Sequence, residues 1–439
     1  MTAPASQKRA GRPKTTVGTK SGDAAPITPS PAALPTLLSV VFLNLLGFGM
    51  VIPLLPFYAQ SFHAEPWQVS LIFSAHAMGS FIGEPYWGRL SDRIGRRPVL
   101  ISTLACNCLC YFFMAFAPSV WSAFFIRFFG GMFAGNASVV QGYIADVTPP
   151  DERAGKLSRI GFAFNIGFIV GPTLSGLLAN PAAGPEGFRL PFLVASALGG
   201  GAALGVFLLV KESRARNVTM HRQPSRWAMF GKATRHSVVG PLLLLTLVAG
   251  CAFNGIESTF GFWGEHRFSW GPRETGLVFG LVGVTNALAQ WFCTGPLSRR
   301  FGEARMLAAG MALTVAATLM VPFAWNLPSA ALFMSLMAFG QSVAFPNVSA
   351  LISRVSDPDR QGQALGLNNA TNAFARFLGP LSAGLAFKQV SVAAPFIGGA
   401  VLVAPAIFLA LAAGRAAPKA PILGAEPGEG DAARPPGIV

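Results

Sequence analysis

The chain has 439 residues, of which 52% are hydrophobic and only 12% are charged. A soluble domain carries about 25% charged residues, so most of this protein's surface cannot face water. The net charge of +15 would suit a nucleic-acid-binding protein, but the basic residues gather in every second loop between apolar runs. Composition and charge distribution therefore exclude a soluble domain and a nucleic-acid partner, and they indicate a protein embedded in the lipid bilayer.

Both ends of the chain lack apolar runs. Residues 1–35 are rich in Ala, Pro, Ser, Thr and Lys, and residues 414–439 are rich in Ala, Pro and Gly. Such segments cannot bury enough apolar surface to fold, so we expect two disordered tails. The first apolar run begins near Leu37 and is too long for a signal peptide.

Apolar runs long enough to cross a bilayer, about 20 residues each, fill the chain between the tails. They must be helices, because irregular backbone facing lipid leaves polar groups unsatisfied. The N-terminal half, 36–210, is expected to hold six spans, at 36–59, 69–90, 99–117, 120–143, 157–180 and 190–210. A basic linker, 211–236, leads to a C-terminal half, 237–413, with six more, at 237–262, 274–297, 304–324, 328–352, 364–388 and 391–413.

The distribution of Lys and Arg predicts which way the spans point. The tails and the loops after even-numbered spans, with the residues at their edges, hold 27 of the 33, whereas the loops after odd-numbered spans hold four. Cytoplasmic loops carry the excess of basic residues in membrane proteins. We therefore expect both termini to be cytoplasmic.

The two halves share sequence. GRLSDRIGRRPVL (88–100) and GPLSRRFGEARML (295–307) align without gaps at an offset of 207 and are identical at six of thirteen positions. Arg153 of PDERAG matches Arg360 of PDRQG near the same offset, and a Gly-Pro pair follows in both halves. Two copies of a six-helix unit are typical of a transporter whose site lies between the halves.

The loop 88–97 concentrates four arginines and an aspartate in a weakly charged chain. Its glycines allow close helix approach and a tight turn, and Asp92 can pair with an arginine. We predict a latch that holds one conformation and releases in the other; the alternative is a simple topology signal, which would need neither the glycines nor the aspartate. The expected gating residues are Gly88, Asp92, Arg93, Gly95, Arg96, Arg97 and Arg153, with Gly295, Arg300 and Gly302 in the second copy.

These motifs resemble a known family. The loop after the second span is similar to the signature loop of the major facilitator superfamily. LGFGMVIPLLP (46–56), RFFGGMFAGNASVVQGYIADVTPPDER (127–153) and GFIVGPTLSG (167–176) resemble its twelve-span drug:proton antiporters, especially the tetracycline exporter group. The resemblance covers about 36–413 and implies an all-α membrane protein with twelve transmembrane helices in two six-helix pseudo-repeats. It also implies that Gly171 and Pro172 kink the fifth span in favour of exchange, although an ordinary packing kink would need the same residues.

The chain departs from the tetracycline exporters at four positions. The resemblance implies acids in their first, third and ninth spans and a histidine in the eighth. The matching residues here are Asn44, Cys110, Thr314 and Asn286. We therefore leave open whether tetracycline is transported, and any proton coupling must use other groups.

Away from the span ends, only four charged residues lie inside the expected spans: Glu84, Glu257, Arg127 and Arg376. A charge at the bilayer centre costs at least ~2.5–3.5 kcal/mol and is functional by default. Glu257 is the first candidate for the proton carrier and Glu84 the second, with a structural ion pair as the alternative for each. Arg127 matches the family's fourth-span arginine, which the resemblance implicates in proton movement. His76, two turns before Glu84, is expected to be a packing residue.

Polar side chains within the spans predict a central cavity. NNATNAFAR (368–376) is too polar for a helix that faces lipid, so it should face the cavity or the other half. The expected cavity residues are Asn44, Arg127, Asn254, Glu257, Asn286, Gln341, Asn372 and Arg376.

The sequence thus predicts a proton-coupled exporter of small, amphipathic organic compounds, acting as a monomer in a bacterial plasma membrane. Its partners would be the substrate, protons and lipid. No nucleotide-binding loop, metal-ligand cluster or nucleophile constellation appears in the sequence, so we expect neither an enzyme nor a cofactor. The alternatives are an importer or uniporter of the same fold, and a receptor or scaffold that transports nothing.

Overall fold

The computed structural model describes residues 33–148, 150–213, 231, 233–357 and 361–417. The spans of the N-terminal half are α1 (Ala33–Gln60), α2 (Pro66–Ile94), α3 (Arg96–Ala115), α4 (Val120–Met132) with α5 (Asn136–Val147), α6 (Pro150–Leu178), and α7 (Arg189–Leu209) preceded by the 3₁₀ segment η1 (Pro181–Phe188). Those of the C-terminal half are α9 (Val239–Phe268), α10 (Pro272–Leu288) with the π segment η2 (Ala289–Thr294) and α11 (Gly295–Phe301), α12 (Glu303–Met320) followed by η3 (Val321–Phe323), α13 (Leu327–Arg354), α14 (Gln361–Gln389) and α15 (Ala394–Ala416).

The described helices thus form twelve spans in two six-helix halves, as the sequence predicted. The boundaries shift slightly: α1 begins at Ala33, three residues before the expected start, and α15 continues to Ala416. The rest of the two tails and residues 214–230 of the linker lie outside the described residues. The expected disorder of the tails stays a prediction.

The fourth span is broken between α4 and α5 around Phe133–Gly135. A break frees the last carbonyls of the preceding helix, and these need new hydrogen-bond donors. The indole of Trp87 on α2 donates to the carbonyl of Met132 at 2.7 Å. A Cβ at Gly135 would lie 2.7 Å from the side chain of Trp87, so glycine makes room for the ring.

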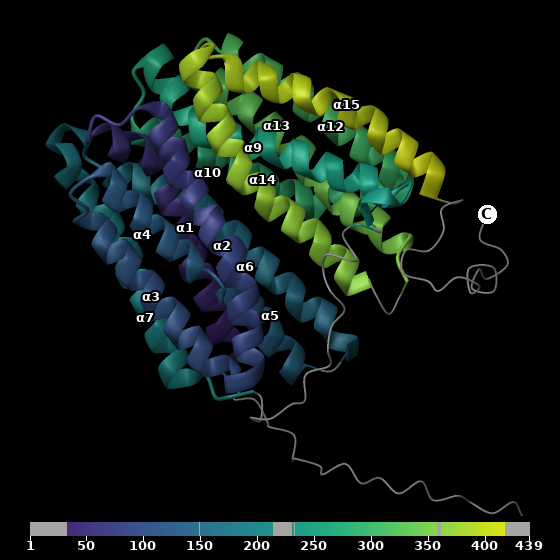
Figure 1. Ribbon diagram of the computed structural model, residues 1–439, viewed down its shortest axis with the longest axis horizontal. Helices are drawn as coiled ribbons and strands as arrows, with labels where there is room; N and C mark the ends of the chain where they lie inside the picture. Colours follow the sequence, from purple (N-terminus) through teal and green to yellow (C-terminus); the bar gives the residue numbers. More distant parts are fainter. Residues whose placement is uncertain (1–32, 149, 214–230, 232, 358–360, 418–439) are drawn as a thin grey trace, which may run out of the picture.

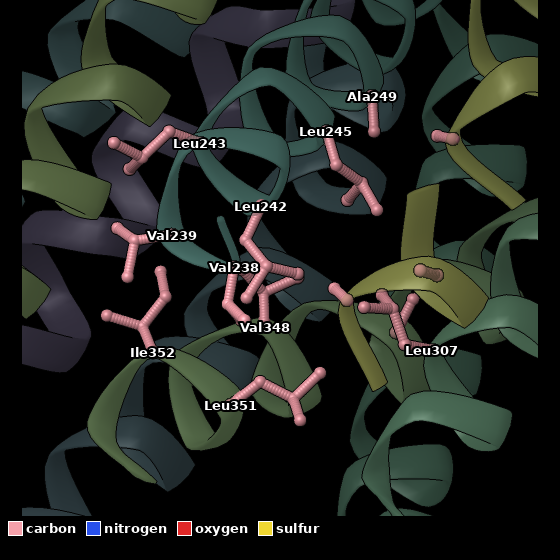
Figure 2. Close-up of a cluster of buried hydrophobic side chains, with 14 of the residues drawn as sticks. Val238, Val239, Leu242, Leu243, Leu245, Ala249, Leu307, Val348, Leu351 and Ile352 are labelled. Atoms are coloured by element: carbon pink, nitrogen blue, oxygen red, sulfur yellow. The ribbon is translucent and has the colours of Figure 1, made fainter. Parts of the chain in front are cut away.

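Apolar clusters hold each half together. On α9 the residues Leu242, Leu245 and Ala249 follow the spacing of one helix face, and all three are buried. They belong to a cluster with residues of α12, α13 and α15. Figure 2 shows part of this cluster, with Val348 of α13 beside Leu242 and Val238.

The two halves form two bundles that meet at one end and diverge toward the other (Figure 1). We call the end where α2 finishes and α3 begins the basic end, and the opposite end, where α1 finishes and α2 begins, the far end. Across the halves α2 packs on α14, and α6 packs on α10. These two helix pairs form what we call the seam.

Glycine brings the backbones together at the far end of the seam. A Cβ at Gly176 of α6 would lie 2.5 Å from the carbonyl oxygen of Pro272, at the start of α10. In the repeat, a Cβ at Gly384 of α14 would lie 2.5 Å from the Cβ of Ser70, near the start of α2. The seam is therefore nearly symmetric and closely packed at this end.

Polar contacts add to the closure of the far end. The amide of Gln60 on α1 donates to the carboxylate of Glu265 on α9. The ammonium of Lys388 on α14 forms an ion pair with Glu65, which precedes α2. Together these two contacts, which we call the far-end clasp, join the two halves near the ends of their helices.

The seam thins toward the basic end. Asn165 of α6 donates to Gln290 at 3.3 Å, and the ring of Phe162 contacts that of Trp291. Nearer the basic end, a Cβ at Gly161, Gly295 or Gly366 would meet nothing within 4 Å. The halves are closed on each other at the far end and open at the basic end.

Nine of the described helices or helix pairs are long and apolar enough to cross a membrane on composition alone. The spans that miss this criterion are α2, α4 with α5, and α14. Two of these, α2 and α14, pack against each other across the seam. Residues 368–376 lie on α14, and they were expected to face the cavity or the other half. Asn368 and Asn372 contact α9 of the same half, whereas Arg376 lines a cavity between the halves.

Candidate substrate and proton site

A small cavity lies between the two halves, and we call it the central cavity. Its walls come from α1, α2 and α4 of the first half and from α9 and α14 of the second. They comprise Phe48, Ile52, Phe73, His76, Ala77, Ser80, Arg127, Asn254, Glu257, Arg376 and Pro380. The structure thus brings together three of the four charges that the sequence placed inside the spans.

Arg127 is buried beside the central cavity. Only 5% of its surface is exposed, and its Nε has no hydrogen-bond partner. The guanidinium lies over the ring of Phe48, 6.0 Å from the ring centroid. Glycine fixes the position of α4 against α2, because a Cβ at Gly131 would collide with the carbonyl of His76.

His76 also lines the central cavity, in addition to packing as expected. Its ring lies 5.3 Å from that of Phe48, and its buried Nδ1 has no hydrogen-bond partner. The sequence offered one hint of this placement, since His76 lies on α2 among the serines Ser74 and Ser80. Such polarity is unusual for a helix surface that faces lipid.

Among the described residues, Glu257 is the only acid that lines the central cavity. It is partly buried on α9, which packs closely on α14: a Cβ at Gly379 would collide with the backbone of Cys251. Arg376 of α14 interacts electrostatically with Glu257. Their nitrogen and oxygen atoms do not come within 4.0 Å, so the direct ion pair that the sequence suggested is not formed in this conformation.

Glu84 lies on α2, partly buried and two turns nearer to the basic end than His76. It does not line the central cavity, but Arg376 interacts with it electrostatically. Arg376 therefore stands between two acids. Its own side chain is exposed, which places it at the open side of the cavity.

The other expected cavity residues have partners of their own. Asn254 lines the cavity but donates its amide to the carbonyl of Gly250 at 2.7 Å. Asn44 accepts a hydrogen bond from Asn107 within the first half, and Asn286 accepts one from Ser342 within the second.

Gln341 and Asn372, two more of these residues, also lie outside the cavity walls. Gln341 lies on α13, where its side chain is buried, and it is not part of the cavity walls. Asn372 lies on α14 one turn before Arg376, and its amide oxygen faces Gly250 of α9. Neither residue lines the cavity in this conformation.

The loop between α2 and α3 is held by an acid from another loop. Gly95 adopts φ +105°, which favours glycine, and a Cβ there would collide with the carboxylate of Glu212. Glu212 accepts hydrogen bonds from the backbone nitrogens of Arg96 and Arg97, at 2.8 and 3.1 Å. The start of a helix is the positive end of its dipole and attracts a negative charge. Glu212 therefore caps α3.

Arg96 links the loop 88–97 to α5 through a network of ion pairs and hydrogen bonds. It forms ion pairs with Asp92 at 2.7 Å and with Asp146 of α5 at 3.1 Å, and it donates to Ser91. A Cβ at Gly142 would clash with its guanidinium. These contacts of Arg96 all join parts of the first half.

The remaining first-half gating residues divide between surface and interior. Arg93 is exposed, and Arg97 donates to the carbonyl of Phe207 at 2.6 Å. Gly88 has space beside it, with only Ser138 within 4 Å of a Cβ. The side chain of Arg153 lies outside the described residues.

The second copy of the loop keeps the turn but reverses the charges. Gly302 adopts φ +84°, and Gly295 and Arg300 are exposed. At the position of Arg96 the repeat has Glu303, which pairs with Arg354 of α13 at 3.3 Å. The ion pair between the third and fourth spans thus recurs between the ninth and tenth with its signs exchanged.

Gly171 and Pro172 mark a close approach of three helices. A Cβ at Gly171 would lie 2.6 Å from the carbonyl oxygen of Leu46 on α1. A Cβ at Gly276 of α10 would collide with the carbonyl of Pro172, across the seam. This pair therefore belongs to the seam as well as to the packing of the first half.

Two six-helix halves around a charged, partly apolar cavity define a membrane transporter. Comparison with known proteins then identifies the family. The sequence profile of the Major Facilitator Superfamily matches residues 37–283 and 242–436. The chain belongs to this superfamily, and it is a multi-pass membrane transporter of small molecules.

Individual relatives cover most of the chain. The tetracycline resistance protein, class C, of Escherichia coli is 31% identical over 354 residues, 80% of this chain and 88% of that protein. The quinolone resistance protein NorA of Staphylococcus aureus (strain COL) is 27% identical over 356 residues, 81% and 89%. The inward-facing, unoccupied structure of a bacterial homolog to the human lysosomal transporter Spinster superposes with a TM-score of 0.71 at 16% identity, covering 88% of this chain and 97% of that one. The last comparison shows the fold.

Proposed function

We propose that this transporter exports small, amphipathic organic compounds in exchange for protons, by alternating access of the central cavity. The observation that carries the proposal is the placement of Glu257, the one acid in the described part of the chain that lines the central cavity. The relatives named for tetracycline and quinolone resistance support drug-like compounds as the cargo. With an acid in this position, the proton and the substrate can compete for the same carboxylate.

The same arrangement suggests the coupling step. Glu257 takes up a proton when the cavity faces the outside and gives it up when the cavity faces the cytoplasm. A substrate that carries a positive group binds the ionised carboxylate and so competes with the proton. Glu84, which shares the field of Arg376, is the second candidate for this role.

We also propose that the basic end is cytoplasmic and that the membrane is the bacterial plasma membrane. With twelve spans, the described ends Ala33 and Ala416 lie on the same side. The excess of Lys and Arg in the loops on that side supports a cytoplasmic location. In this orientation the structure is an inward-open state, and the far-end clasp is the closed external gate.

Both halves of the cavity come from one chain, so we propose the monomer as the transporting unit. In the cycle the far end opens while the loop 88–97 closes the basic end. The ion pair between Lys388 and Glu65 must break in that step. Arg96 and Asp92 are then positioned to stabilise the opposite conformation.

The test uses inside-out membrane vesicles with an imposed proton gradient and a pH-sensitive dye. Amphipathic drugs, tetracycline included, are added singly to wild type, Glu257→Gln and Glu84→Gln. We expect a substrate to dissipate the gradient in wild type and in Glu84→Gln but not in Glu257→Gln. Equal dissipation of the gradient in wild type and Glu257→Gln would show that Glu257 is not the proton-carrying group.

Two further results would favour the alternatives. A compound that equilibrates across proteoliposomes without moving protons would make the protein a uniporter or importer. No flux of any compound would favour a receptor or scaffold. The exchange model requires both substrate flux and proton flux.

A further inference from the structure

Arg127 is a buried cation without a counter-ion. No acid among the described residues lies within 4.0 Å of its guanidinium, and its Nε has no partner. Buried charges are normally paired, because an unpaired charge forfeits its hydration without compensation. The side chain nevertheless lines the central cavity. This combination indicates that an anionic group of the cargo completes the pair.

Arg376 differs from Arg127, because two acids lie within its electrostatic reach. Arg376 interacts with both Glu257 and Glu84. With Glu257 ionised, the cavity walls carry two arginines and one acid. The surplus of one positive charge therefore falls on Arg127.

Exchange for protons places a second requirement on the charge of the cargo. A cargo that carried only a negative charge would favour protonation of Glu257, and cargo and proton would then bind together. Only a positive group at Glu257 makes the two compete. A cargo that carried only a positive charge would compete, but it would leave Arg127 unpaired and be repelled by it.

We propose that the central cavity binds zwitterions: amphipathic compounds with a carboxylate or similar monoanionic group that pairs with Arg127 and an ammonium that pairs with Glu257. Phe48 and Phe73 line the wall beside these groups and face the apolar body of the compound. Phe48 also lies against the guanidinium of Arg127 and the ring of His76. The inference rests on the proposed proton exchange and adds the chemical class of the cargo.

The test uses three forms of one aromatic skeleton: 4′-(aminomethyl)biphenyl-4-carboxylate, its methyl ester and its N-acetyl derivative. They are a zwitterion, a cation and an anion of nearly the same shape. Phenyl and terphenyl analogues of each vary the separation of the charges. Binding to the purified full chain in lipid nanodiscs is measured by calorimetry for wild type, Arg127→Gln, Arg127→Lys and Glu257→Gln.

In wild type we expect the best zwitterion to bind about tenfold or more tightly than its ester or its N-acetyl form, since each loses one charged hydrogen bond. Arg127→Gln should make zwitterion and ester bind equally, and Arg127→Lys should restore part of the difference. Glu257→Gln should instead make zwitterion and N-acetyl form bind equally. A merely structural role of Arg127 would weaken all three forms alike and would overturn the proposal.

Tighter binding of either singly charged form by wild type, or no binding of any form, would also overturn it. Proton release in vesicles separates this inference from the proposed function. A zwitterion that binds as predicted but moves no protons leaves the cargo class standing and refutes exchange. An ester that drives exchange where the zwitterion does not leaves exchange standing and refutes the cargo class.

Discussion

Gly176→Ala should shift the transporter toward the far-end-open conformation. A Cβ at this position would lie 2.5 Å from the carbonyl oxygen of Pro272, whereas ordinary contacts begin at 3.4 Å. The backbones of α6 and α10 must therefore separate by about 0.9 Å (3.4 minus 2.5) at this point. The same methyl group meets no such obstacle once the far end has opened.

The size of the shift follows from the cost of overpacking. Inserting a methyl group into a closely packed contact costs about 1–3 kcal/mol. Only the far-end-closed state is destabilised in this way. The ratio of far-end-open to far-end-closed molecules should therefore rise about 5- to 150-fold. Gly384→Ala, at the symmetric position on α14, should act in the same direction through Ser70.

The assay measures the distance between spin labels on opposite halves. Labels at Ala182 and Val390, both exposed near the far end, are introduced after the five native cysteines have been replaced. The variants should populate a longer distance that wild type lacks or shows rarely. Gly201→Ala on α7 is the matched control, because a Cβ there meets nothing within 4 Å.

Unchanged distances in folded Gly176→Ala protein would refute the reasoning. They would mean that the contact with Pro272 does not stabilise the closed far end. An equal change in Gly201→Ala would show that the label reports a general effect of the substitution. Either result would mean that close packing at the seam does not determine the balance between the far-end-closed and far-end-open conformations.

Two further predictions concern the acids at the two ends of the bundle. Glu212→Gln removes the negative charge at the start of α3 but keeps one acceptor oxygen, and such a charge stabilises a helix by about 0.3–1 kcal/mol. Thermal unfolding should therefore occur at a lower temperature than in the control Glu186→Gln, whose exposed carboxylate pairs with Arg189. Equal unfolding temperatures would contradict the cap. Lys388 and Trp67 hold the pKa of Glu65 below its usual range, so the far-end clasp should persist at neutral pH and weaken only as the pH falls through that lowered pKa. Lys388→Gln should show a small opening already at neutral pH, whereas a spin-label distance identical to that of wild type at every pH would contradict the role of the clasp.

Much of the site was predictable because charge stands out in an apolar background. Arg127, Glu257 and Arg376 were found as charges inside spans, and all three line one cavity. The polarity of residues 368–376 predicted a helix facing the cavity or the other half, and Arg376 at the end of this segment lines the cavity. Such predictions work because lipid excludes unpaired polar groups, so each exception must have a protein environment.

Amide side chains were a weaker guide. Asn44 and Asn286 were expected in the cavity, yet they bond to Asn107 and Ser342 within their own halves. An amide can be satisfied by one neighbour on an adjacent helix, so its presence in a span does not reveal which face it occupies.

Contacts between loops were beyond reach of the sequence. Glu212 and Asp146 hold Arg96, but they lie 116 and 50 residues away along the chain. Hydropathy and repeats place helices in order without fixing the rotation of each one. The role of Gly95 as the site where a carboxylate approaches the backbone follows only from the three-dimensional arrangement.

The backbone seam separates what can change in this protein from what cannot. Gly176 and Gly384 meet the opposite half so closely that any larger residue would push it away, so these positions tolerate little variation. The cavity walls, in contrast, include side chains such as Phe48, Ile52 and Asn254, which lie on α1 and α9 and can be exchanged without changing the helices of the seam. New substrate ranges can therefore arise through a few substitutions in the walls, while the moving parts are inherited unchanged.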